Sequence, residues 1–480
     1  MQTYEEKRRL LHSGSVHQHS PHPREQADPF PTFADPWILS HQRILGHTVS
    51  VDRQINVLVL PCGAESALEV WRALKDVVNI TLFGSSSRSD HGEFAFKNIV
   101  SGIPAVQAPD FIDRLNAAIA EHGITAIFPC HDTVAEVLTA NRTRINATVV
   151  CSSAETARIC RHKFALQALF EPEGITPARI NGVPHAGDYP VFAKPDLGEG
   201  GKGARMLANA QDHDRFFGEF DRSGYLLTEY LPGEEATVDC FSDRHGALEF
   251  IGPRTRERVW AGISVRTQAL PAAAFADMAA IIHQRLQPRG LWFFQAKRDA
   301  RGTWKLLEVS TRVSSSMGLY RPLGANLPLL ALYDALDMDV QVRVMDRPIV
   351  MDRALMPTYR IGIDYDTVYL DLDDTLLING HVHGPAIRFA YACVDNGKRL
   401  VLITKHASDL QNTLERYRIS PRLFDDIIHL KEGEHKRDHI ASSNSIFIDN
   451  AYAERRAVSE AHGIPVFDVD ALDALIDPRG

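Results

Sequence analysis

Short apolar runs alternate with amphipathic segments over residues 55–155. The runs INVLVL, NITLFG and ITAIFPC have the length and composition of buried strands. Between them, SALEVWRALKDV and DFIDRLNAAIAEHG carry apolar residues at helical spacing. This alternation predicts βαβ units with a parallel sheet, so we expect an α/β domain over residues 51–155. Ligands of such sheets bind beyond the carboxyl ends of the strands, which is where Gly63 and the segment 130–132 are expected.

The pattern changes after residue 155. One helical segment, ETARICRHKFALQALF, is followed by strand-rich stretches such as VFAK, YLLTEYL, EEATVDCFS, LWFFQAKRD and WKLLEVS. Runs of strands that are not separated by regular helices indicate an α+β region with antiparallel sheets. We therefore expect a second domain over residues 156–350.

Strands and helices alternate again over residues 365–480. The runs TVYLDLDDT, RLVLITKH and SIFIDN read as strands, and the segment around AIRFAYACVDNG reads as a helix. A compact third domain of ordinary size follows from this pattern. The stretch around 347–365 reads as a linker. Residues 1–50, which are rich in His, Pro and polar side chains, are expected to form an extension that is flexible or packs on a neighbour.

Composition narrows the function without defining it. The formal net charge of -9 offers no overall attraction to nucleic acid or to an anionic membrane, so anionic substrates would need a local basic pocket. The 6 cysteines form no CxxC pair and read as reduced thiols. No apolar run approaches the roughly 18 residues that a membrane span needs, and no signal-peptide pattern begins the sequence. We expect a cytoplasmic protein without nucleic-acid or membrane partners.

Two carboxylates follow the first strand of the third domain directly. Asp371 and Asp373, at the end of the TVYL run, can converge on a cation such as Mg²⁺, which prefers oxygen ligands. An aspartate can also attack phosphorus as a nucleophile. The next strand ends with Thr404, and the one after it ends with Asp449, a third carboxylate for a metal. Either Lys436 or Lys431 could balance the charge. This spacing predicts a magnesium-dependent phosphoryl-transfer site.

These segments resemble the haloacid dehalogenase (HAD) superfamily of phosphatases, and FIDNAYAERRAV is similar to its FkbH-type branch. The resemblance implies a Rossmann-like fold with a minimal cap, because the span between Asp373 and Thr404 is short. It further implies catalytic roles for four residues: Asp371 as nucleophile, Asp373 as general acid and base, and Thr404 and Lys436 as the second- and third-motif residues. Asp371, Asp373 and Asp449 would hold Mg²⁺, and Glu454 would add acidic support. An inactive domain kept for structure is the alternative.

A glycine-rich loop marks the second domain. In VFAKPDLGEGGKGARML, a strand delivers Lys194 and a loop with four glycines follows. Glycines let backbone N–H groups approach phosphates closely, and a lysine adds a point charge. The spacing matches neither a P-loop nor a Rossmann fingerprint. Further along, Gln295 and Glu308 lie on adjacent strand patterns, which a hairpin would bring together over a metal, and Arg312 follows.

This order resembles the ATP-grasp superfamily, in the branch of biotin carboxylase and carbamoyl-phosphate-synthase-like ligases, over residues 55–345, with the parallel βαβ domain as a pre-ATP-grasp domain. The resemblance implies ATP as cofactor, with Mg²⁺ or Mn²⁺, and Glu308 and Gln295 as metal ligands. It makes Arg312 a catalytic residue that stabilises the transferring phosphoryl group. It implies that the remaining nucleotide-binding residues are Lys163, Lys194, Gly200, Gly201, Gly203, Glu229, Tyr230, Leu231 and Glu235, of which the three at 229–231 flank adenine and Glu235 takes the ribose.

The sequence departs from that family at the metal site. The family usually reads Glu-x-Asn-Pro-Arg, whereas this chain has Ser310 in place of the Asn, which is a shorter and weaker ligand. Gln295 also stands where many members have a carboxylate. Structural readings remain open for Lys163 as a solvated helix residue and for Glu234 and Glu235 as exposed turn acids. The run Arg254, Arg256 and Arg258 is either a solvated charge run or a basic pocket for an anionic substrate.

Three functions follow from these features. The first is a bifunctional enzyme in which an ATP-grasp ligase joins a small-molecule carboxylate to an amine through an acyl phosphate, and a phosphatase hydrolyses a phosphorylated substrate through an aspartyl-phosphate. The second is a small-molecule kinase paired with a phosphatase. The third is a nucleotide-sensing ATP-grasp module that regulates the phosphatase. The ligase resemblance also implies a homodimer.

Overall fold

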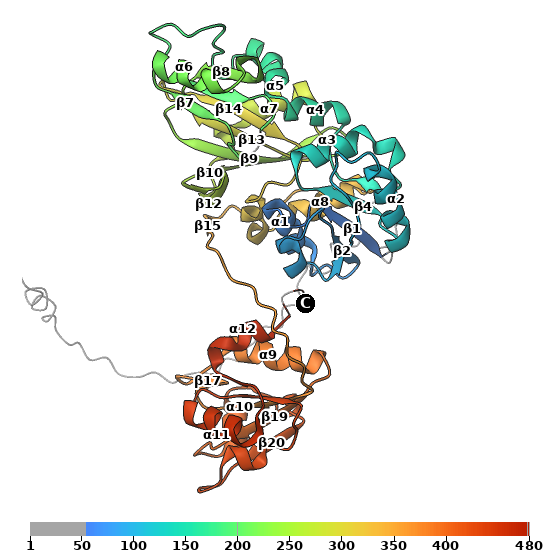
Figure 1. Ribbon diagram of the computed structural model, residues 1–480, viewed down its shortest axis with the longest axis vertical. Helices are drawn as coiled ribbons and strands as arrows, with labels where there is room; N and C mark the ends of the chain where they lie inside the picture. The colour runs from blue at the N-terminus through green and yellow to red at the C-terminus, as the bar shows by residue number, and fades with distance from the viewer. Residues whose placement is uncertain (1–53, 199, 478, 480) are drawn as a thin grey trace, which may run out of the picture. The chain divides into compact units, whose positions relative to one another are not determined.

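A parallel sheet forms the first part of the chain that the computed structural model describes, which covers residues 54–198, 200–477 and 479 (Figure 1). The predicted extension 1–50 lies outside these residues. All strand pairs in this sheet are parallel, and the order is β3-β2-β1-β4-β5. The five strands are β1 (Ile55–Leu60), β2 (Ile80–Gly84), β3 (Asn98–Ile99), β4 (Ala126–Pro129) and β5 (Thr148–Val149). The parallel sheet predicted from the alternating pattern is therefore present.

Helices cover both faces of this sheet because its central strands are apolar on both sides. Val57 and Val59 of β1 face α1 (Glu65–Leu74) and α8 (Leu327–Ala335). Leu58 and Leu60 face the opposite layer of α2 (Phe111–His122) and α3 (Asp132–Ala140). Continuous apolar strands are the pattern that two-sided burial requires.

Two antiparallel sheets follow, as the strand-rich pattern after residue 155 predicts. A three-stranded sheet has the order β7-β6-β8 and a four-stranded sheet has the order β10-β9-β13-β14. The first contains β6 (Val191–Pro195), β7 (Arg205–Leu207) and β8 (Tyr225–Glu229), with α5 (Lys163–Phe170) and α6 (Ala210–Glu219) nearby in sequence. The second contains β9 (Glu235–Ser242), β10 (Leu248–Thr255), β13 (Gly290–Arg298) and β14 (Trp304–Ser310), and α7 (Ala276–Leu286) precedes β13. A further small sheet joins β11 (Arg258–Trp260), β12 (Ile263–Gln268) and β15 (Val350–Asp352).

A shared core fuses the parallel sheet to the four-stranded sheet. Phe241 of β9 and Leu291 of β13 are buried in the same cluster as the α1 and α8 face of the parallel sheet. Helix α4 (Ala154–Arg161) connects the two parts along the chain, and the Thr156 hydroxyl donates to the Leu286 carbonyl at 2.9 Å. Burial of this continuous apolar surface holds the two sheets in a fixed relation.

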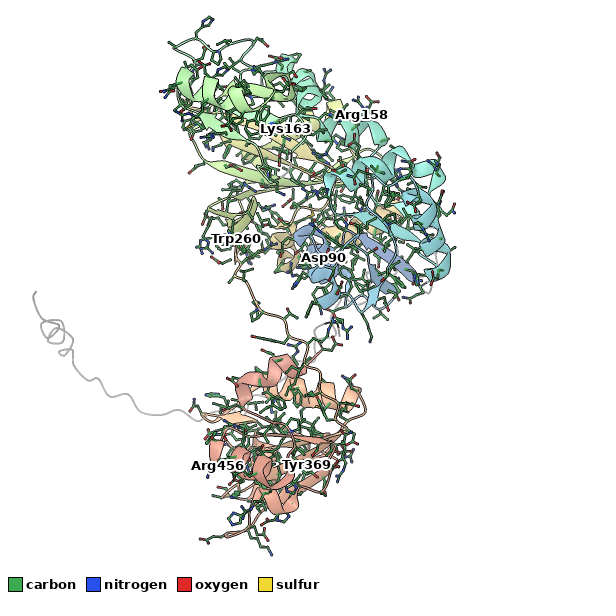
Figure 2. All side chains as sticks on the ribbon, in the orientation of Figure 1. Asp90, Arg158, Lys163, Trp260, Tyr369 and Arg456 are labelled. Carbon is green, nitrogen blue, oxygen red and sulfur yellow. The ribbon has the colours of Figure 1, made fainter. Side chains whose placement is uncertain are left out.

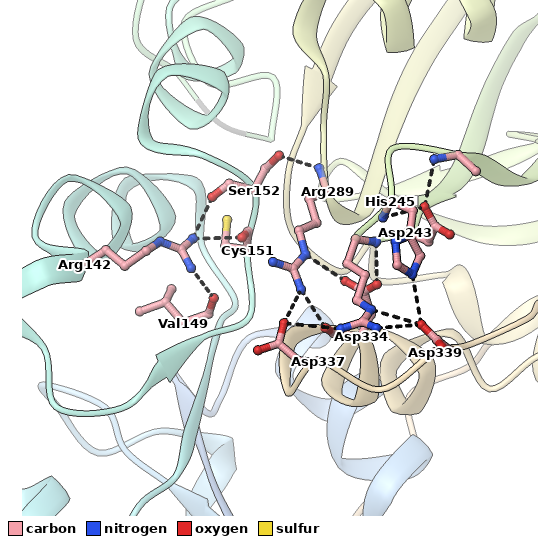
Figure 3. Close-up of polar contacts among 12 residues, drawn as sticks. Arg142, Val149, Cys151, Ser152, Asp243, His245, Arg289, Asp334, Asp337 and Asp339 are labelled. Atoms are coloured by element: carbon pink, nitrogen blue, oxygen red, sulfur yellow. Dashed lines mark hydrogen bonds and ion pairs between the residues drawn. The ribbon is translucent and has the colours of Figure 1, made fainter. Parts of the chain in front are cut away.

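A polar network reinforces the same junction (Figure 3). Arg142 donates to the carbonyls of Val149, Cys151 and Ser152, which shapes the turn after β5. The Ser152 hydroxyl in turn accepts the backbone N–H of Arg289 at 2.9 Å. Arg289 also pairs with Asp334, which is 1% exposed.

The C-terminal part is a second parallel α/β unit (Figure 1). Its sheet has the order β20-β19-β16-β21-β22, with β16 (Thr367–Leu370), β19 (Arg399–Thr404), β20 (Asp426–His429), β21 (Ser445–Ile448) and β22 (Val466–Phe467). Between β16 and β19 the chain forms the hairpin of β17 (Leu377–Ile378) and β18 (His381–Val382) and then α9 (Gly384–Asp395). The helices α10 (Leu410–Arg416), α11 (Tyr452–His462) and α12 (Leu472–Leu475) complete it. No separate cap of several elements is inserted between β16 and β19.

No helix within the described ranges could cross a lipid bilayer. The two longest α-helices of those ranges, α2 and α9, have 12 residues each, whereas a span needs about 20. The six cysteines, all within the described residues, are free thiols.

The buried carboxylate of Asp334 is expected to stabilise the junction of the two sheets. Its Oδ1 accepts the backbone N–H of Arg244 at 2.6 Å, and its Oδ2 accepts Nε of Arg289 at 3.0 Å. Asp334→Ala leaves both donors unsatisfied, so we expect a loss of about 3 kcal/mol in the free energy of unfolding, seen as a lower midpoint in thermal melts. Asp337→Asn is the control, because Asp337 is 77% exposed, pairs with the same Arg289 and has a φ of 62°, which asparagine tolerates. Equal melting temperatures for the two variants would contradict this role.

Candidate functional site

A single cleft of about 410 Å³ collects most of the residues that the sequence predicts to bind ATP. It is lined by the glycine loop, by both strands of the β13–β14 hairpin, and by the first turns that follow β1 and β4 of the parallel sheet. The predicted residues among its lining are Lys163, Lys194, Gly200, Gly201, Glu235, Gln295, Glu308 and Arg312. Gly203, Glu229, Tyr230 and Leu231 do not line it.

The glycine loop connects β6 to β7 in a tight antiparallel hairpin. Gly200 and Gly201 have φ angles of 58° and 75°, in the left-handed region that favours glycine. The loop also packs closely on the turn between β11 and β12, since a Cβ added to Gly262 would lie 2.9 Å from the Cα of Gly200. Backbone N–H groups in such a loop can approach a phosphate closely.

Three lysines line the cleft, of which Lys202 belongs to the glycine loop itself. Lys194 is buried near the end of β6, and Lys163 begins α5 (Figure 2). The Lys163 ammonium donates to the Gly198 carbonyl at 3.1 Å, which ties α5 to the glycine loop. Lys163 thus lines the cleft, and its contact with the phosphates of ATP stays a prediction.

Burial lowers the pKa of the Lys194 ammonium to about 8. The carboxylate of Glu308 opposes that effect, and the charge of Lys163 adds to it. The side chain is therefore charged at neutral pH but loses its proton at mildly alkaline pH.

The register of the four-stranded sheet sets one row of side chains across the cleft. Gln295 of β13 lies opposite Glu308 of β14, as the predicted hairpin requires. Thr237 of β9 lies opposite Gln295, and Arg254 of β10 lies opposite Thr237. Directly opposed residues share one face of a sheet, so this row presents a carboxylate, an amide, a hydroxyl and a guanidinium in sequence.

Glu308 and Gln295 have the donor chemistry for a shared metal ion. Within the described parts of the chain, no three His, Cys, Asp or Glu side chains form a group that could hold a metal by themselves. Mg²⁺ commonly takes only one or two carboxylates and completes its shell with substrate phosphates and water. The pair fits that mode, in which the nucleotide supplies the remaining ligands.

Arg312 is fixed by a residue that the sequence analysis did not assign to the site. Asp132, the first residue of α3, accepts Nε and Nη2 of Arg312 at 3.0 and 2.9 Å. Ser310 also donates to Asp132, at 2.6 Å. Burial opposes ionisation of Asp132, yet the Arg312 guanidinium outweighs it and holds the pKa of that carboxyl below its usual range.

This contact accounts for the departure from the family motif. The Ser310 hydroxyl, weighed above as a weak metal ligand, is engaged with Asp132. The only sequence signal for Asp132 is its place just after an apolar strand at the ligand-binding edge of a parallel sheet. A link from residue 132 to residue 312 across 180 positions could not be found from spacing.

The three arginines at positions 254, 256 and 258 do not share one environment. Arg254 and Arg256 line the cleft, whereas Arg258 is exposed and pairs with Asp352 at 2.6 Å. Arg256 pairs with Glu235 at 2.6 Å. Glu235, expected to take the ribose, is therefore a cleft residue with a cationic partner, and the reading as an exposed turn acid is wrong.

The three predicted adenine-flanking residues lie at the end of β8 and just after it. Glu229 accepts the backbone N–H of Ala178 at 2.8 Å, Leu231 is buried, and Lys297 lies over the Tyr230 ring at 5.9 Å from its centroid. Their role in nucleotide binding stays a prediction.

A second cluster of charged residues lies at the carboxyl edge of the C-terminal sheet. Asp371 follows β16, Asp449 follows β21, and both are buried. The Lys436 ammonium donates to Asp371 at 2.5 Å and to Asp449 at 2.6 Å. The structure thus selects Lys436 rather than Lys431 as the lysine beside the carboxylates.

The remaining predicted residues surround this pair. Thr404 is buried at the end of β19, and its hydroxyl accepts the backbone N–H of His406. Asp373 is half exposed and pairs with Nδ1 of His406 at 2.9 Å. His406 is a further residue at this edge that the sequence analysis missed. Glu454 pairs with Lys405 at 2.6 Å rather than joining the buried carboxylates.

The two buried carboxylates share one ammonium. Burial raises the pKa of Asp371 to about 6, Lys436 opposes that rise, and Asp449 adds to it. One negative charge in this group of three side chains is left without a partner of opposite sign. The donor set therefore fits an oxygen-liganded divalent cation, which Asp371 and Asp449 would hold.

The sheets and their order identify the fold of the first two parts. A parallel αβ sheet followed by two antiparallel sheets that enclose a glycine-loop cleft is the ATP-grasp arrangement, and the chain contains an ATP-grasp domain. Residues 221–354 match the family model described as "ATP-grasp in the biosynthetic pathway with Ter operon". No curated protein matches the sequence.

Solved structures share this fold at low sequence identity. N5-carboxyaminoimidazole synthetase from Staphylococcus aureus, complexed with ADP, has a TM-score of 0.53 at 13% identity, and the similarity covers 63% of this chain and 82% of that one. Biotin carboxylase from Campylobacter jejuni, in a β,γ-ATP complex, has a TM-score of 0.51 at 16% identity, covering 62% of this chain and 74% of that one. These similarities concern the fold alone.

The lowered pKa of Lys194 predicts a pH dependence of nucleotide binding. The ammonium is charged below about pH 8 and neutral above it, so we expect ATP to bind more weakly as pH rises through that value. Titration of ATP at fixed Mg²⁺ between pH 6.5 and 9.5 tests this. The control is Lys194→Arg, whose charge persists and which should remove the inflection. An unchanged inflection in that variant would assign the effect to another group.

Proposed function

We propose that the ATP-grasp part is an ADP-forming ligase that joins a small-molecule carboxylate to an amine. The observation that carries this proposal is the meeting of Lys163, Lys194 and Glu308 with the glycine loop around one cleft. In this proposal the ligase comprises domains 51–155 and 156–350. The nucleotide is ATP, with Mg²⁺ or Mn²⁺ between Glu308 and the phosphates.

Two chemical steps follow from this assignment. A substrate carboxylate oxygen attacks the γ-phosphorus of ATP, the bond to the β-phosphate oxygen breaks, and ADP leaves with that electron pair. An amine nitrogen then attacks the acyl carbon and inorganic phosphate departs, which leaves an amide after loss of a proton. Phosphoryl transfer of this kind depends on positioning and charge neutralisation more than on covalent participation of the protein.

The side chains of the cleft divide these tasks. Lys194 and Lys163 place positive charge beside the glycine loop, where the phosphates of ATP would lie. Arg312, fixed by Asp132, keeps its guanidinium in one orientation, which supports a role in stabilising the transferring phosphoryl group. Gln295 and Glu308 would orient the nucleotide through the shared cation, which supplies Lewis-acid stabilisation of the phosphate charge.

Glu308→Ala is expected to abolish ATP turnover. Loss of the one carboxylate in the row removes the protein's charged ligand for the nucleotide-bound metal, so ADP release should fall by at least about 100-fold. A coupled ADP assay with carboxylate and amine mixtures measures this. Glu234→Ala is the control, because that side chain is 83% exposed beside the cleft strand β9. ATP turnover that survives in Glu308→Ala would contradict the assignment of Glu308 as a metal ligand. Wild-type protein that binds ATP without turning it over would favour the alternative in which the ATP-grasp part is a nucleotide sensor.

Amine dependence separates ligation from simple phosphorylation. A ligase releases inorganic phosphate and ADP together only when an amine is supplied. A kinase forms ADP and a stable phosphorylated product without one. Phosphorus NMR of the reaction mixture distinguishes these outcomes directly.

We further propose that residues 365–480 form a magnesium-dependent phosphatase. The observation that supports it is the buried arrangement of Asp371, Lys436 and Asp449 at the carboxyl edge of a parallel sheet. Asp371 would attack the phosphorus of a phosphate ester, and Asp373 would protonate the departing oxygen. Asp373 would then accept a proton from the water that hydrolyses the aspartyl-phosphate.

The surrounding side chains support these roles. Lys436 holds Asp371 in one place and balances its charge. Thr404 presents a hydroxyl at the end of the neighbouring strand, suited to a phosphate oxygen. His406 fixes the half-exposed Asp373 on the same edge of the sheet. The cation held by Asp371 and Asp449 would neutralise phosphate charge.

Asp371→Asn should eliminate hydrolysis of a generic phosphate ester. The amide is not a nucleophile toward phosphorus, so the rate should fall to background while the fold persists. Release of p-nitrophenol from its phosphate ester in Mg²⁺ buffer measures this. Asp374→Asn is the control, because Asp374 is an exposed neighbour whose φ of 56° asparagine tolerates. Lys194→Ala should leave this activity unchanged, and hydrolysis that persists in Asp371→Asn would exclude it as the nucleophile.

The proposed assembly and location complete the hypothesis. A biotin carboxylase domain from Hydrogenobacter thermophilus with the same fold is described as a dimer, at 17% identity and a TM-score of 0.50. A homodimer is proposed for this chain on that basis, together with a cytoplasmic location. Sedimentation of the purified protein tests the first.

A further inference from the structure

Arg254 is the most buried charged side chain of the cleft lining. It lies on β10 at the end of the cross-sheet row, and 2% of it is exposed. Its Nε donates to Asp239 at 2.7 Å, and its Nη2 donates to the Ser314 hydroxyl at 3.0 Å. The third nitrogen, Nη1, has no hydrogen-bond partner among the described residues.

The surroundings lock this guanidinium in place. Asp239 is fully buried and also accepts the Ser314 hydroxyl at 2.6 Å. Asp239 and Ser314 therefore accept hydrogen bonds from Nε and Nη2 of the guanidinium, and Nη1 is left without an acceptor among the described residues. A buried donor without an acceptor destabilises the folded protein, so an arrangement of this kind is expected where a ligand supplies the acceptor.

The terminal nitrogens of the other two cleft arginines all have acceptors. Those of Arg312 donate to Val313 and Asp132, and those of Arg256 donate to Thr237 and Gly262. The Nε atom of Arg256 has no hydrogen-bond partner of good geometry among the described residues, but it lies 2.6 Å from a Glu235 oxygen. Arg254 differs because one of its terminal nitrogens has no acceptor among the described residues while the side chain is almost completely removed from water.

We propose that Arg254 binds a carboxylate of the acceptor substrate, separate from the group that is activated by ATP. Nη1 offers N–H donors in a fixed plane, one of which can donate to a carboxylate oxygen of a ligand, and the guanidinium charge strengthens such a bond. Its own positive charge is largely balanced by Asp239, so the subsite suits a single negative charge better than a doubly charged phosphate. The substrate class is a dicarboxylate, which includes the acidic amino acids.

Arg254 and Glu308 lie at opposite ends of the row of side chains that crosses the four-stranded sheet. The carboxylate subsite at Arg254 is therefore separate from Glu308, where the phosphates of ATP and the metal would lie. Arg254 is three strands from Glu308, through Thr237 and Gln295, which corresponds to about 14 Å between backbones. Both residues line the same cleft, so a ligand that fills it would lie between their side chains. One small molecule can therefore present a first carboxylate to the ATP phosphates and a second one to Arg254. This inference rests on the proposed ligase function.

The test compares matched acids in the presence of ATP and Mg²⁺. The panel pairs succinate with butyrate and glutarate with valerate, and adds aspartate and glutamate. Thermal shift and amine-dependent ADP release are measured for each. We expect the acids with a second carboxylate to stabilise the protein and to be turned over, and their monocarboxylate partners to do neither.

The variant Arg254→Lys sharpens the test. Lysine keeps a positive charge beside Asp239, but its single nitrogen cannot pair with Asp239 and Ser314 and also donate to a ligand from the position of Nη1. The KM for the dicarboxylate should therefore rise at least about tenfold while the affinity for ATP is unchanged. The control is Arg258→Lys on the exposed strand β11, which should match wild type. Unchanged ATP affinity in both variants shows that the cleft remains folded.

The outcomes separate this inference from the ligase proposal. Equal responses to mono- and dicarboxylates, an unaltered KM in Arg254→Lys, or ATP binding with no response to any acid of the panel would each overturn the carboxylate subsite and leave the ATP site standing. Failure of ATP itself to bind, or binding that does not depend on Lys194, would instead overturn the proposed function.

Discussion

The antiparallel pairing of β10, β9, β13 and β14 is the constraint on which the cleft depends. A shift of one residue in any of these pairings would turn Glu308, Gln295, Thr237 and Arg254 away from one another, because successive side chains of a strand point to opposite faces. The core on the other face of this sheet, which includes the fully buried Trp292, fixes that register. Packing on one face therefore determines chemistry on the other.

Charge in the cleft is organised by partners from distant segments. Asp132, from the parallel sheet, holds Arg312 at the end of the antiparallel one. The contact between the parallel sheet and the four-stranded sheet is thus part of the site, because it fixes the orientation of Arg312. Lys194 lacks such a close carboxylate partner, which is why burial dominates its pKa. The same principle operates in the C-terminal unit, where one lysine serves two buried carboxylates and leaves a charge for a cation to balance.

Much of the architecture could be predicted from periodicity. Apolar runs such as INVLVL identified the parallel strands, since only two-sided burial favours continuous apolar residues. The Gln295–Glu308 hairpin and the buried carboxylate at Asp371 also followed from strand ends and spacing. Glu234 is 83% exposed, as an exposed turn acid would be, whereas Glu235 lines the cleft, because exposure depends on what the rest of the chain packs against each side chain.

The sequence by itself determined the strands, the glycine loop and the type of chemical group at each strand end, because these depend on residues that are close along the chain. Only the tertiary structure decided which groups meet. Asp132 with Arg312, Asp239 with Arg254, and Asp373 with His406 are pairs separated by many residues, and no local pattern encodes their contact. The unpartnered Nη1 of Arg254 likewise follows from the tertiary structure, since a donor can be said to lack an acceptor only when the positions of its neighbours are known.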